Sequence, residues 1–514
     1  MSTMGPGDLG SRTDFTGPAA SSDEVLTTTP VVLFQRSRFQ ALSNLLLFLL
    51  AVKFVFYFLD SRPKFLLGDS RSYLWTALTG WIPDDRSFVF GFLLQPLTVW
   101  PHSFTPFVVF QVFISGVTAW LLGLCLIRYF SVRLRWAAAC AFLCAVEPLQ
   151  LISERFVLTE AVSTFLFVCC MVLALGYLKS GRLIYLVFLE IISIPLISIR
   201  VSFLPFVLAG SVLFPVLGPP AVTLWRAIFR RARFKEGMAK DAVLSRTGTV
   251  VLHLFVAVLL SQALLYGYRR WNGHLLGRPA AYLYTDGFML AADWAPVIRP
   301  IDFPFAELRQ PIFDGVKIDL HDPKARNAQL FAEGGLIPVL RSFVKDQFLA
   351  NKLAKKMALR AAKRDPIAVL KLGATTYGSF FDTKYLAYTV GVEEGFGNGE
   401  AREQRWIQEL ATNFNEQFDG IHIYSLTQKW HAAALPWYKF LMIAPVVVVL
   451  LAPFTEKAYW PQWVVMCLFN CMFVGVAVFA TQEPTVRYLV ADAWLTILSL
   501  GALASSVGRR WAGR

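Results

Sequence analysis

Apolar segments of membrane-crossing length recur along most of the chain, separated by short polar connections. A helix needs about 20 predominantly apolar residues to cross a bilayer. Segments that approach this length are 39–59, 104–127, 136–152, 157–178, 183–199, 201–218, 248–267, 437–453, 460–480 and 488–506. We therefore predict an all-α polytopic membrane protein with about ten transmembrane helices.

Basic residues gather in every second connection between these segments. They include Arg36, Arg38, Arg128, Arg133, Arg135, Lys179, Arg182, Arg226, Arg230, Arg231, Arg233, Lys235, Lys240, Arg246, Lys457, Arg509, Arg510 and Arg514. All of them fall on one side if the N-terminus is cytoplasmic, as the positive-inside rule expects of short loops. The prediction is a multi-pass protein of the cytoplasmic (inner) membrane with both termini in the cytoplasm.

This alternation divides the chain into five parts. Residues 1–38 are rich in Ser, Thr, Gly and Pro and are predicted to form a disordered cytoplasmic tail. They are not predicted to be part of a signal peptide, because the apolar segment that follows is too long for one. A transmembrane bundle spans 39–267 and contains a first outer loop at 60–103. Residues 268–436 form a long, mainly helical outer (periplasmic) region, 437–506 hold the C-terminal transmembrane helices, and 507–514 form a short cytoplasmic tail.

Composition supports the membrane assignment and limits the partners. Hydrophobic residues make up 56% of the chain and charged residues only 16%, which is more apolar surface than one soluble core needs. The net charge of +14 follows largely from the basic loops, so we expect no nucleic-acid partner. All seven cysteines fall in apolar segments, and we therefore expect no disulfides in the outer region.

The first outer loop contains a polar motif beside an aromatic one. Leu67–Trp75 places Asp69, Ser70, Arg71 and Ser72 next to Tyr73, Leu74 and Trp75, a pattern typical of a short helix on the membrane surface. The run Phe88–Trp100 is short for a crossing and is predicted to form a second surface helix. The simplest interpretation of Asp69 is an N-cap.

Further ionisable residues lie at the ends of the predicted spans. They are Glu147, Glu154, Arg155, Glu160, Arg200, Glu483, Arg487 and Asp492. In the predicted topology all of them reach the leaflet at which Asp69 lies. Half-buried charges in a membrane cost a few kcal/mol each, so their convergence at one depth favours a functional site over a set of helix-end salt bridges.

Four short motifs resemble one family of membrane enzymes. They are Gly68–Leu74, Glu147–Gln150 leading to Val157–Ala161, Ser198–Val201, and Val486–Val490. In order and sidedness they are similar to the GT-C glycosyltransferases, specifically the bacterial branch that includes the aminoarabinose transferases and the protein O-mannosyltransferase relatives. The resemblance covers about half the chain: the first six spans and the last.

The resemblance implies an activity and a set of site residues. Members of the family transfer a sugar from a polyprenyl-phosphate carrier outside the cytoplasmic membrane, here to a glycan, lipid or protein acceptor. Asp69 is then the candidate catalytic base. The candidate substrate-binding residues are Tyr73, Arg86, Glu154, Arg155, Glu160, Arg200 and Arg487. Arg86-Ser87-Phe88 keeps the family's Arg but lacks the Pro and Tyr that usually follow, so acceptor identity does not carry over.

The same residue types fit this chemistry on physical grounds. A carboxylate can take a proton from an acceptor hydroxyl, and arginine binds phosphate through two hydrogen bonds. The six histidines show no metal-ligand spacing, so we expect neither zinc nor another cofactor. A divalent cation held by Asp69 and a second acid remains an alternative.

Other functions are compatible with a large basic membrane protein. A lipid-linked polysaccharide polymerase or ligase is the nearest alternative, and a non-catalytic transporter or scaffold is another. A transporter is expected to place its charges near the bilayer midplane in repeated halves, and the sequence shows no such repeat. The basic helix predicted for 346–372 presents either a solvated face or a contact with lipid phosphates.

Overall fold

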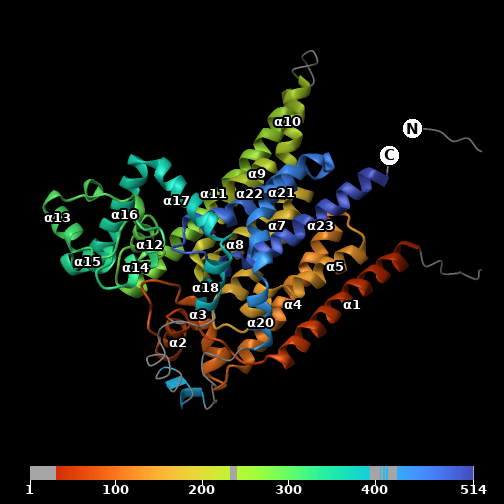
Figure 1. The fold of residues 1–514 in the computed structure, drawn as a ribbon. Helices are drawn as coiled ribbons and strands as arrows, with labels where there is room; N and C mark the ends of the chain where they lie inside the picture. Colours follow the sequence, from red (N-terminus) through yellow and green to blue (C-terminus); the bar gives the residue numbers. More distant parts are fainter. Residues whose placement is uncertain are drawn as a thin grey trace, which may run out of the picture. The chain divides into compact units, whose positions relative to one another are not determined.

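The computed structural model describes residues 30–66, 68–231, 240–393, 406, 409–410, 412–414 and 425–512. The chain divides into two units, Met1–Asn44 and Leu45–Arg514, and the side-chain contacts described below lie within the second. Helices make up the secondary structure of the described residues (Figure 1), apart from one isolated parallel bridge between Lys64 and Phe156. The predicted all-α class is therefore confirmed for the described part of the chain.

Within the described residues, seven helices are long and apolar enough to cross a membrane, and a bent pair raises the number to eight. The seven candidate spans are Phe39–Leu59 in α1 (Pro30–Leu59), α4 (Thr105–Phe130), α7 (Glu160–Ser180), Thr247–Leu276 in α11 (Lys240–Leu276), Leu435–Phe454 including α21 (Leu435–Leu451), Lys457–Phe479 including α22 (Trp460–Phe479), and Val486–Arg510, mostly in α23 (Val490–Ala512). The chain is thus a multi-pass helical membrane protein. Residues 30–38, predicted as part of the disordered tail, belong to α1, whereas residues 1–29 lie outside the described part.

Three predicted crossings are shorter or broken. The segment 136–152 is divided into two helices, α5 (Leu134–Ala145) and α6 (Pro148–Ser153). The break occurs because Pro148 lacks the N–H that would continue the first helix. Glu147 caps the new helix by accepting a hydrogen bond from the Gln150 N–H at 2.7 Å. The segment 183–199 forms the 17-residue α8 (Leu183–Ile199). The bent pair joins α9 (Leu204–Leu217) to α10 (Pro219–Arg231) at an angle of 50°.

Buried polar side chains link neighbouring spans. The Trp494 indole of α23 donates to the Thr118 carbonyl oxygen of α4 at 3.1 Å. Asn470 of α22 donates to Ser499 at 3.2 Å and accepts from Thr496 at 3.1 Å, both in α23. Such hydrogen bonds fix the register of one helix against the next. Hydrophobic attraction between the helices cannot do so, because the surrounding lipid tails are as apolar as the helices.

Two short helices form the first loop. The helix α2 (Asp69–Thr79) packs on α3 (Val89–Leu94), which continues as a π-turn over Gln95–Val99. Tyr73 meets Phe90 edge-on, with ring centroids 4.9 Å apart. Gly91 allows the close approach, because a Cβ there would lie 2.5 Å from Thr76. Both predicted helices of the first loop are present, and their location on the membrane surface stays a prediction.

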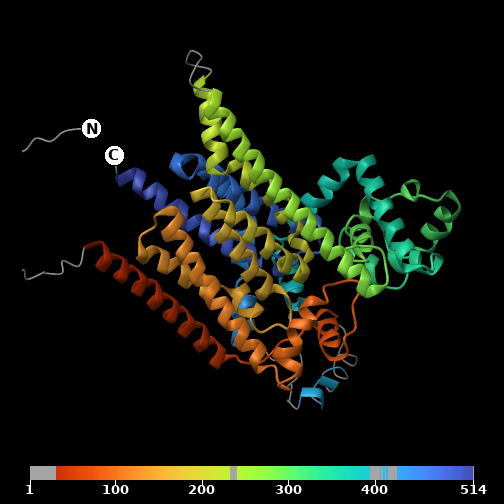
Figure 2. The same ribbon diagram turned by 180° about the vertical axis from the view of Figure 1, so that it is seen from behind.

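Residues 286–393 form a series of short helices (Figure 2), and those over residues 286–379 share a separate hydrophobic core. In chain order these are α12 (Asp286–Asp293), α13 (Ala306–Gly315), α14 (Arg326–Phe331), α15 (Leu336–Phe343), α16 (Gln347–Arg364), α17 (Pro366–Ser379) and α18 (Thr383–Glu393). The basic helix predicted over 346–372 is divided between α16 and α17, where Asp365 caps α17 and Pro366 begins it. The helix α20 (Leu426–Ala433) precedes the last three spans.

Candidate functional site

The two carboxylate oxygens of Asp69 bind two different arginines. Arg86 Nη1 lies 2.6 Å from Oδ1, and Arg487 Nη1 lies 2.6 Å from Oδ2. The Asp69 side chain is 27% exposed, so solvent still reaches it. Asp69 does not cap α2, because Gly68 occupies the N-cap position with φ of 76° and Asp69 is the first helical residue. The N-cap interpretation of Asp69 is therefore wrong.

Electrostatics keep Asp69 ionised. Burial on its own would raise the Asp69 pKa, but the charges of Arg487 and Arg86 outweigh it and hold the pKa below its usual value. Burial and the neighbouring Asp69 charge raise the pKa of Tyr73. An aspartate held by two cations is a weak base until one of them is drawn away.

The Arg86 guanidinium is held in place by its own loop. Asp85 accepts two hydrogen bonds from it, with Nε–Oδ1 of 3.1 Å and Nη2–Oδ2 of 2.5 Å. The guanidinium also lies over the Tyr73 ring, 5.9 Å from the centroid. Tyr73 thus contributes to the site by supporting Arg86 from α2.

Arg487 reaches the site from the opposite end of the chain. It lies in a 3₁₀ turn, Val486–Leu489, immediately before α23. The preceding loop is tied to the α12–α18 helices: Arg326 Nη1 donates to the Thr481 carbonyl oxygen at 3.0 Å, and the Trp294 indole donates to the Phe479 carbonyl oxygen at 3.2 Å. These contacts connect the position of Arg487 to residues 268–393.

Glu160 and Arg200 complete the cluster. Glu160 begins α7, and Arg200 lies where α8 ends and a 3₁₀ turn begins. Arg200 Nη1 is 3.0 Å from Glu160 Oε1, and Arg487 Nη1 is 3.9 Å from the same oxygen. Arg200 also lies over the Tyr488 ring, 4.7 Å from its centroid. The structure therefore brings together five of the predicted site residues, Asp69, Arg86, Glu160, Arg200 and Arg487, with Tyr73 beneath Arg86.

Arg487 lines two pockets. The first is small and has a cationic and hydroxyl-bearing side formed by Arg200, Arg487, Ser163, Thr164 and Ser202. Its remaining wall is mostly apolar and aromatic, formed by Phe203, Phe206, Phe473, Val476, Tyr488, Val490 and Ala491. Arg487 Nε is buried and makes no hydrogen bond with the described residues. This pocket suits an anion attached to an apolar chain.

The second pocket contains about 380 Å³ of empty space and is acidic. Glu160 and Glu393 line it together with His431 and an apolar wall that includes Leu149 and Phe156. Glu160 Oε2 and Glu393 Oε1 are both buried without a hydrogen-bond partner in the described chain. Burial raises the Glu393 pKa to about 8 against the opposing charge of Arg487. Polar groups of this kind are satisfied by a ligand with several donors, such as hydroxyl groups.

Glu393 was not predicted from the sequence. It ends α18, shortly before a glycine-rich stretch, and nothing in the spacing separates it from the many other acids of the region. Only the return of α18 toward Arg487 makes it a site residue.

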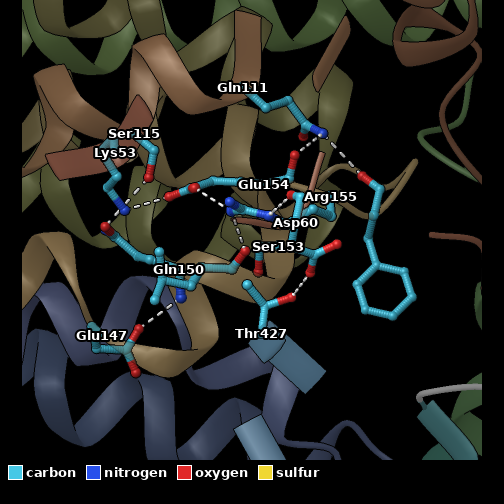
Figure 3. Close-up of polar contacts among 12 residues, drawn as sticks. Lys53, Asp60, Gln111, Ser115, Glu147, Gln150, Ser153, Glu154, Arg155 and Thr427 are labelled. Atoms are coloured by element: carbon cyan, nitrogen blue, oxygen red, sulfur yellow. Dashed lines mark hydrogen bonds and ion pairs between the residues drawn. The ribbon is translucent and has the colours of Figure 1, made fainter. Parts of the chain in front are cut away.

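Glu154 and Arg155 belong to a different cluster (Figure 3). Both are fully buried and form an ion pair, Arg155 Nη1–Glu154 Oε2, of 2.6 Å. Glu154 also pairs with the buried Lys53 of α1. Arg155 Nε donates to the Asp60 carbonyl oxygen at 3.1 Å. Within the described residues neither side chain pairs with Asp69 or Arg487, so the structure does not bring them into the Asp69 cluster, and their role in substrate binding stays a prediction.

The rest of this second cluster is also charged. Lys64 Nζ lies 3.0 Å from Asp60 Oδ2, and Thr427 of α20 donates a hydrogen bond to the same carboxylate. The sequence feature that could have indicated this network is Lys53, a cation inside an apolar span, because such a residue needs a buried partner. The network joins α1 to α6 and α20.

The other acids of the predicted set lie apart from Asp69. Glu147 accepts a hydrogen bond from the Trp437 indole at 2.8 Å. Glu483 lies 3.4 Å from the Asn327 amide, and Asp492 is fully buried in α23. Among the described residues no group of three or more His, Cys, Asp or Glu side chains is placed to hold a metal ion.

No protein-family model matches this chain, and no characterised protein or solved structure matches it either. Function is therefore inferred from the residues and their geometry.

Proposed function

We propose that this protein is a membrane glycosyltransferase of the GT-C type that moves a hexosyl or pentosyl group from a polyprenyl-phosphate carrier to an acceptor hydroxyl. The acceptor is a glycan, lipid or protein at the outer face of the cytoplasmic membrane. The observation that supports this most is the Asp69 carboxylate, held at 2.6 Å by Arg86 and by Arg487 beside the Glu160–Arg200 pair. A base and phosphate-binding cations then occupy one small volume.

The bond changes in this reaction are simple. The acceptor oxygen bonds to the anomeric carbon while the bond from that carbon to the carrier phosphate oxygen breaks. The electron pair leaves with polyprenyl phosphate, and the acceptor's proton passes to Asp69. Arg487 and Arg200 stabilise the charge that develops on the leaving phosphate. No nucleotide takes part in the step.

Carrier binding would activate the base. A phosphate that binds Arg487 competes directly with Asp69 for that guanidinium, whose Nε still lacks a partner. Since the charge of Arg487 lowers the Asp69 pKa, drawing it away raises the pKa and makes Asp69 a stronger proton acceptor. Proton abstraction is thereby coupled to the presence of the donor.

The first Arg487 pocket is the natural place for the carrier. Its two arginines, Arg200 and Arg487, meet the phosphate, and its phenylalanines meet the first prenyl units. The second pocket, with its unpartnered carboxylate oxygens on Glu160 and Glu393, then meets sugar or acceptor hydroxyls. Arg487 lines both pockets, as a residue at the reacting phosphate should.

The finer topology is part of this proposal. We take α5, α8 and the bent α9–α10 pair as crossings in addition to the seven candidate spans, which gives about ten. Both termini are then cytoplasmic, and residues 60–103 and 268–436 are outside. The meeting of Asp69 with Glu160, Arg200 and Arg487 supports a shared leaflet for the first loop and three span ends.

Donor consumption tests the proposal. Purified protein is incubated with a bacterial lipid extract, and the release of free polyprenyl phosphate is measured together with transfer of the sugar. Release of polyprenyl phosphate from a monosaccharide carrier supports the proposal. Consumption of a diphosphate-linked oligosaccharide instead identifies a polymerase or ligase, and no consumption of either contradicts an enzyme of this class.

A further inference from the structure

The helix α17 presents an exposed apolar face that the described part of the chain leaves uncovered. Ile367 is 64% exposed and Leu370 is 61% exposed, and Ala374 extends the same helical face. The opposite side of the helix, with Leu372 and Thr376, is buried. An apolar helical face of this kind in water costs free energy unless something covers it.

Cations adjoin this face without acidic partners. Lys363 lies in the last turn of α16, two residues before the Asp365 cap of α17, and Lys371 follows Leu370 directly. Both are exposed and make no ion pair within the described residues, whereas the nearby Lys355 and Arg364 pair with Asp286 and Asp302. We call Ile367, Leu370 and Ala374, with Lys363 and Lys371, the α17 face.

Contacts with two candidate spans place α17 at the edge of the membrane. Gly373 packs against the Phe479 ring, and a Cβ there would lie 2.2 Å from it. Phe479 is the last residue of α22. Tyr377 donates a hydrogen bond to the Met442 carbonyl oxygen in α21 at 3.2 Å. The helix therefore lies beside α21 and the C-terminal end of α22 (Figure 1). In the proposed topology this is the leaflet where α21 begins and α22 ends.

We propose that the α17 face docks on the lipid surface of that leaflet, with Ile367 and Leu370 inserted among the acyl chains and Lys363 and Lys371 bound to anionic lipid phosphates. An apolar face flanked by lysines is the arrangement by which helices lie in the membrane interface. Charge complementarity favours a lipid surface over a protein partner, because membrane leaflets that contain phosphatidylglycerol are negatively charged. This inference is independent of the proposed enzymatic activity.

The site gains a mechanical constraint from this docking. The loop before Arg487 is tied to α17 through Arg326, whose Nη1 donates to the Thr481 carbonyl oxygen and whose Nη2 donates to Thr376 Oγ1 at 2.9 Å. A docked α17 therefore holds the loop that leads to Arg487 at a defined depth relative to the lipid headgroups.

Depth-dependent fluorescence quenching in nanodiscs tests the proposal. The full-length protein, with its seven cysteines replaced by alanine, receives a single environment-sensitive probe at Leu370→Cys. The discs contain either phosphatidylcholine alone or a mixture with phosphatidylglycerol, and a fraction of the lipids carries a nitroxide near the headgroup. The matched control is Phe331→Cys, an aromatic position 71% exposed in α14, whose only cation, Arg326, is buried.

We expect the probe at 370 to be quenched by the nitroxide lipids and shielded from a water-soluble quencher, and the probe at 331 to show the reverse. Adding Lys363→Gln and Lys371→Gln should shift the docked-to-undocked ratio roughly ten- to thirtyfold toward undocked in the phosphatidylglycerol discs only. Equal exposure of both probes to the water-soluble quencher overturns the proposal. Shielding at 370 without quenching by lipid also overturns it and points to a protein partner or a second copy.

Discussion

Arg487 and Asp69 lie 418 positions apart in the chain and meet at 2.6 Å. The pair joins the first loop to the turn before the last span. Neither segment can move independently while it is formed. In the proposed reaction, a phosphate that binds Arg487 competes directly with this pair.

Asp69→Asn is expected to slow sugar transfer by about 10²–10⁴-fold, because Asn cannot accept the acceptor's proton. The substitution also leaves two arginines facing each other, so we expect a loss of stability of roughly 1–2 kcal/mol, limited by the partial exposure of the site. Transfer from a defined polyprenyl-phosphate sugar and thermal unfolding in detergent measure the two effects.

The matched control is Asp84→Asn, which removes an exposed ion pair with Arg278 from the same loop. It should leave transfer close to that of the wild type. A folded Asp69→Asn protein that turns over within about threefold of the wild type removes Asp69 from the mechanism.

The pH dependence of stability should differ between the wild type and Asp69→Asn. The folded-state pKa of Asp69 lies below its usual value of 3.8. Its ionisation therefore contributes stability that is fully present above that value and is lost as the pH falls toward the folded-state pKa. The difference in Tm between the two proteins should be constant from neutral pH down to about pH 5 and shrink below about pH 4. A difference that grows in acid contradicts the assigned direction.

Arg487→Ala and Arg487→Lys should both weaken carrier binding by about tenfold or more. Alanine removes the guanidinium, and the ammonium group of lysine cannot reproduce its two hydrogen bonds. Binding of polyprenyl phosphate to the purified variants measures this directly. Arg278→Lys, in the exposed pair with Asp84, serves as the comparison and should bind normally. If all three variants bind the carrier like the wild type, Arg487 is an ordinary helix-end ion pair.

The buried network around Glu154 should stabilise the fold and take no part in catalysis. Glu154→Gln leaves Lys53 and Arg155 buried without their anion and should cost about 3–5 kcal/mol of unfolding free energy. Lys53→Met should lower the unfolding free energy much less, because Glu154 still forms its ion pair with Arg155. Transfer per folded molecule should be unchanged in Lys53→Met. A loss of transfer in a stable Lys53→Met protein would assign the network to the reaction.

Topology can be tested with single cysteines in a background without native thiols. A probe at His321, exposed in the α12–α18 region, should react with a membrane-impermeant thiol reagent added to intact cells. A probe at Ser180, exposed at the C-terminal end of α7, should react only after the membrane is opened. The reverse pattern inverts the orientation and places Asp69 on the cytoplasmic side.

The periodicity and length of the apolar segments were enough to predict a helical membrane protein, the two surface helices of the first loop and the break at Pro366. These features are local: a run of about 20 apolar residues or a proline constrains the backbone wherever it occurs. The charges at span ends could also be recognised as a set, because a buried charge needs a partner.

Which charges become partners was decided only by the tertiary structure. Glu154, Arg155 and Glu160 lie within seven positions of one another, yet Glu154 pairs with Lys53 and Arg155, whereas Glu160 pairs with Arg200. Glu393 joins Arg487 only because α18 returns to the bundle. The predicted span 136–152 is interrupted before Pro148. The missing N–H of this proline ends the helix although the segment is predominantly apolar. Pairing across hundreds of residues depends on helix packing, and no local spacing encodes it.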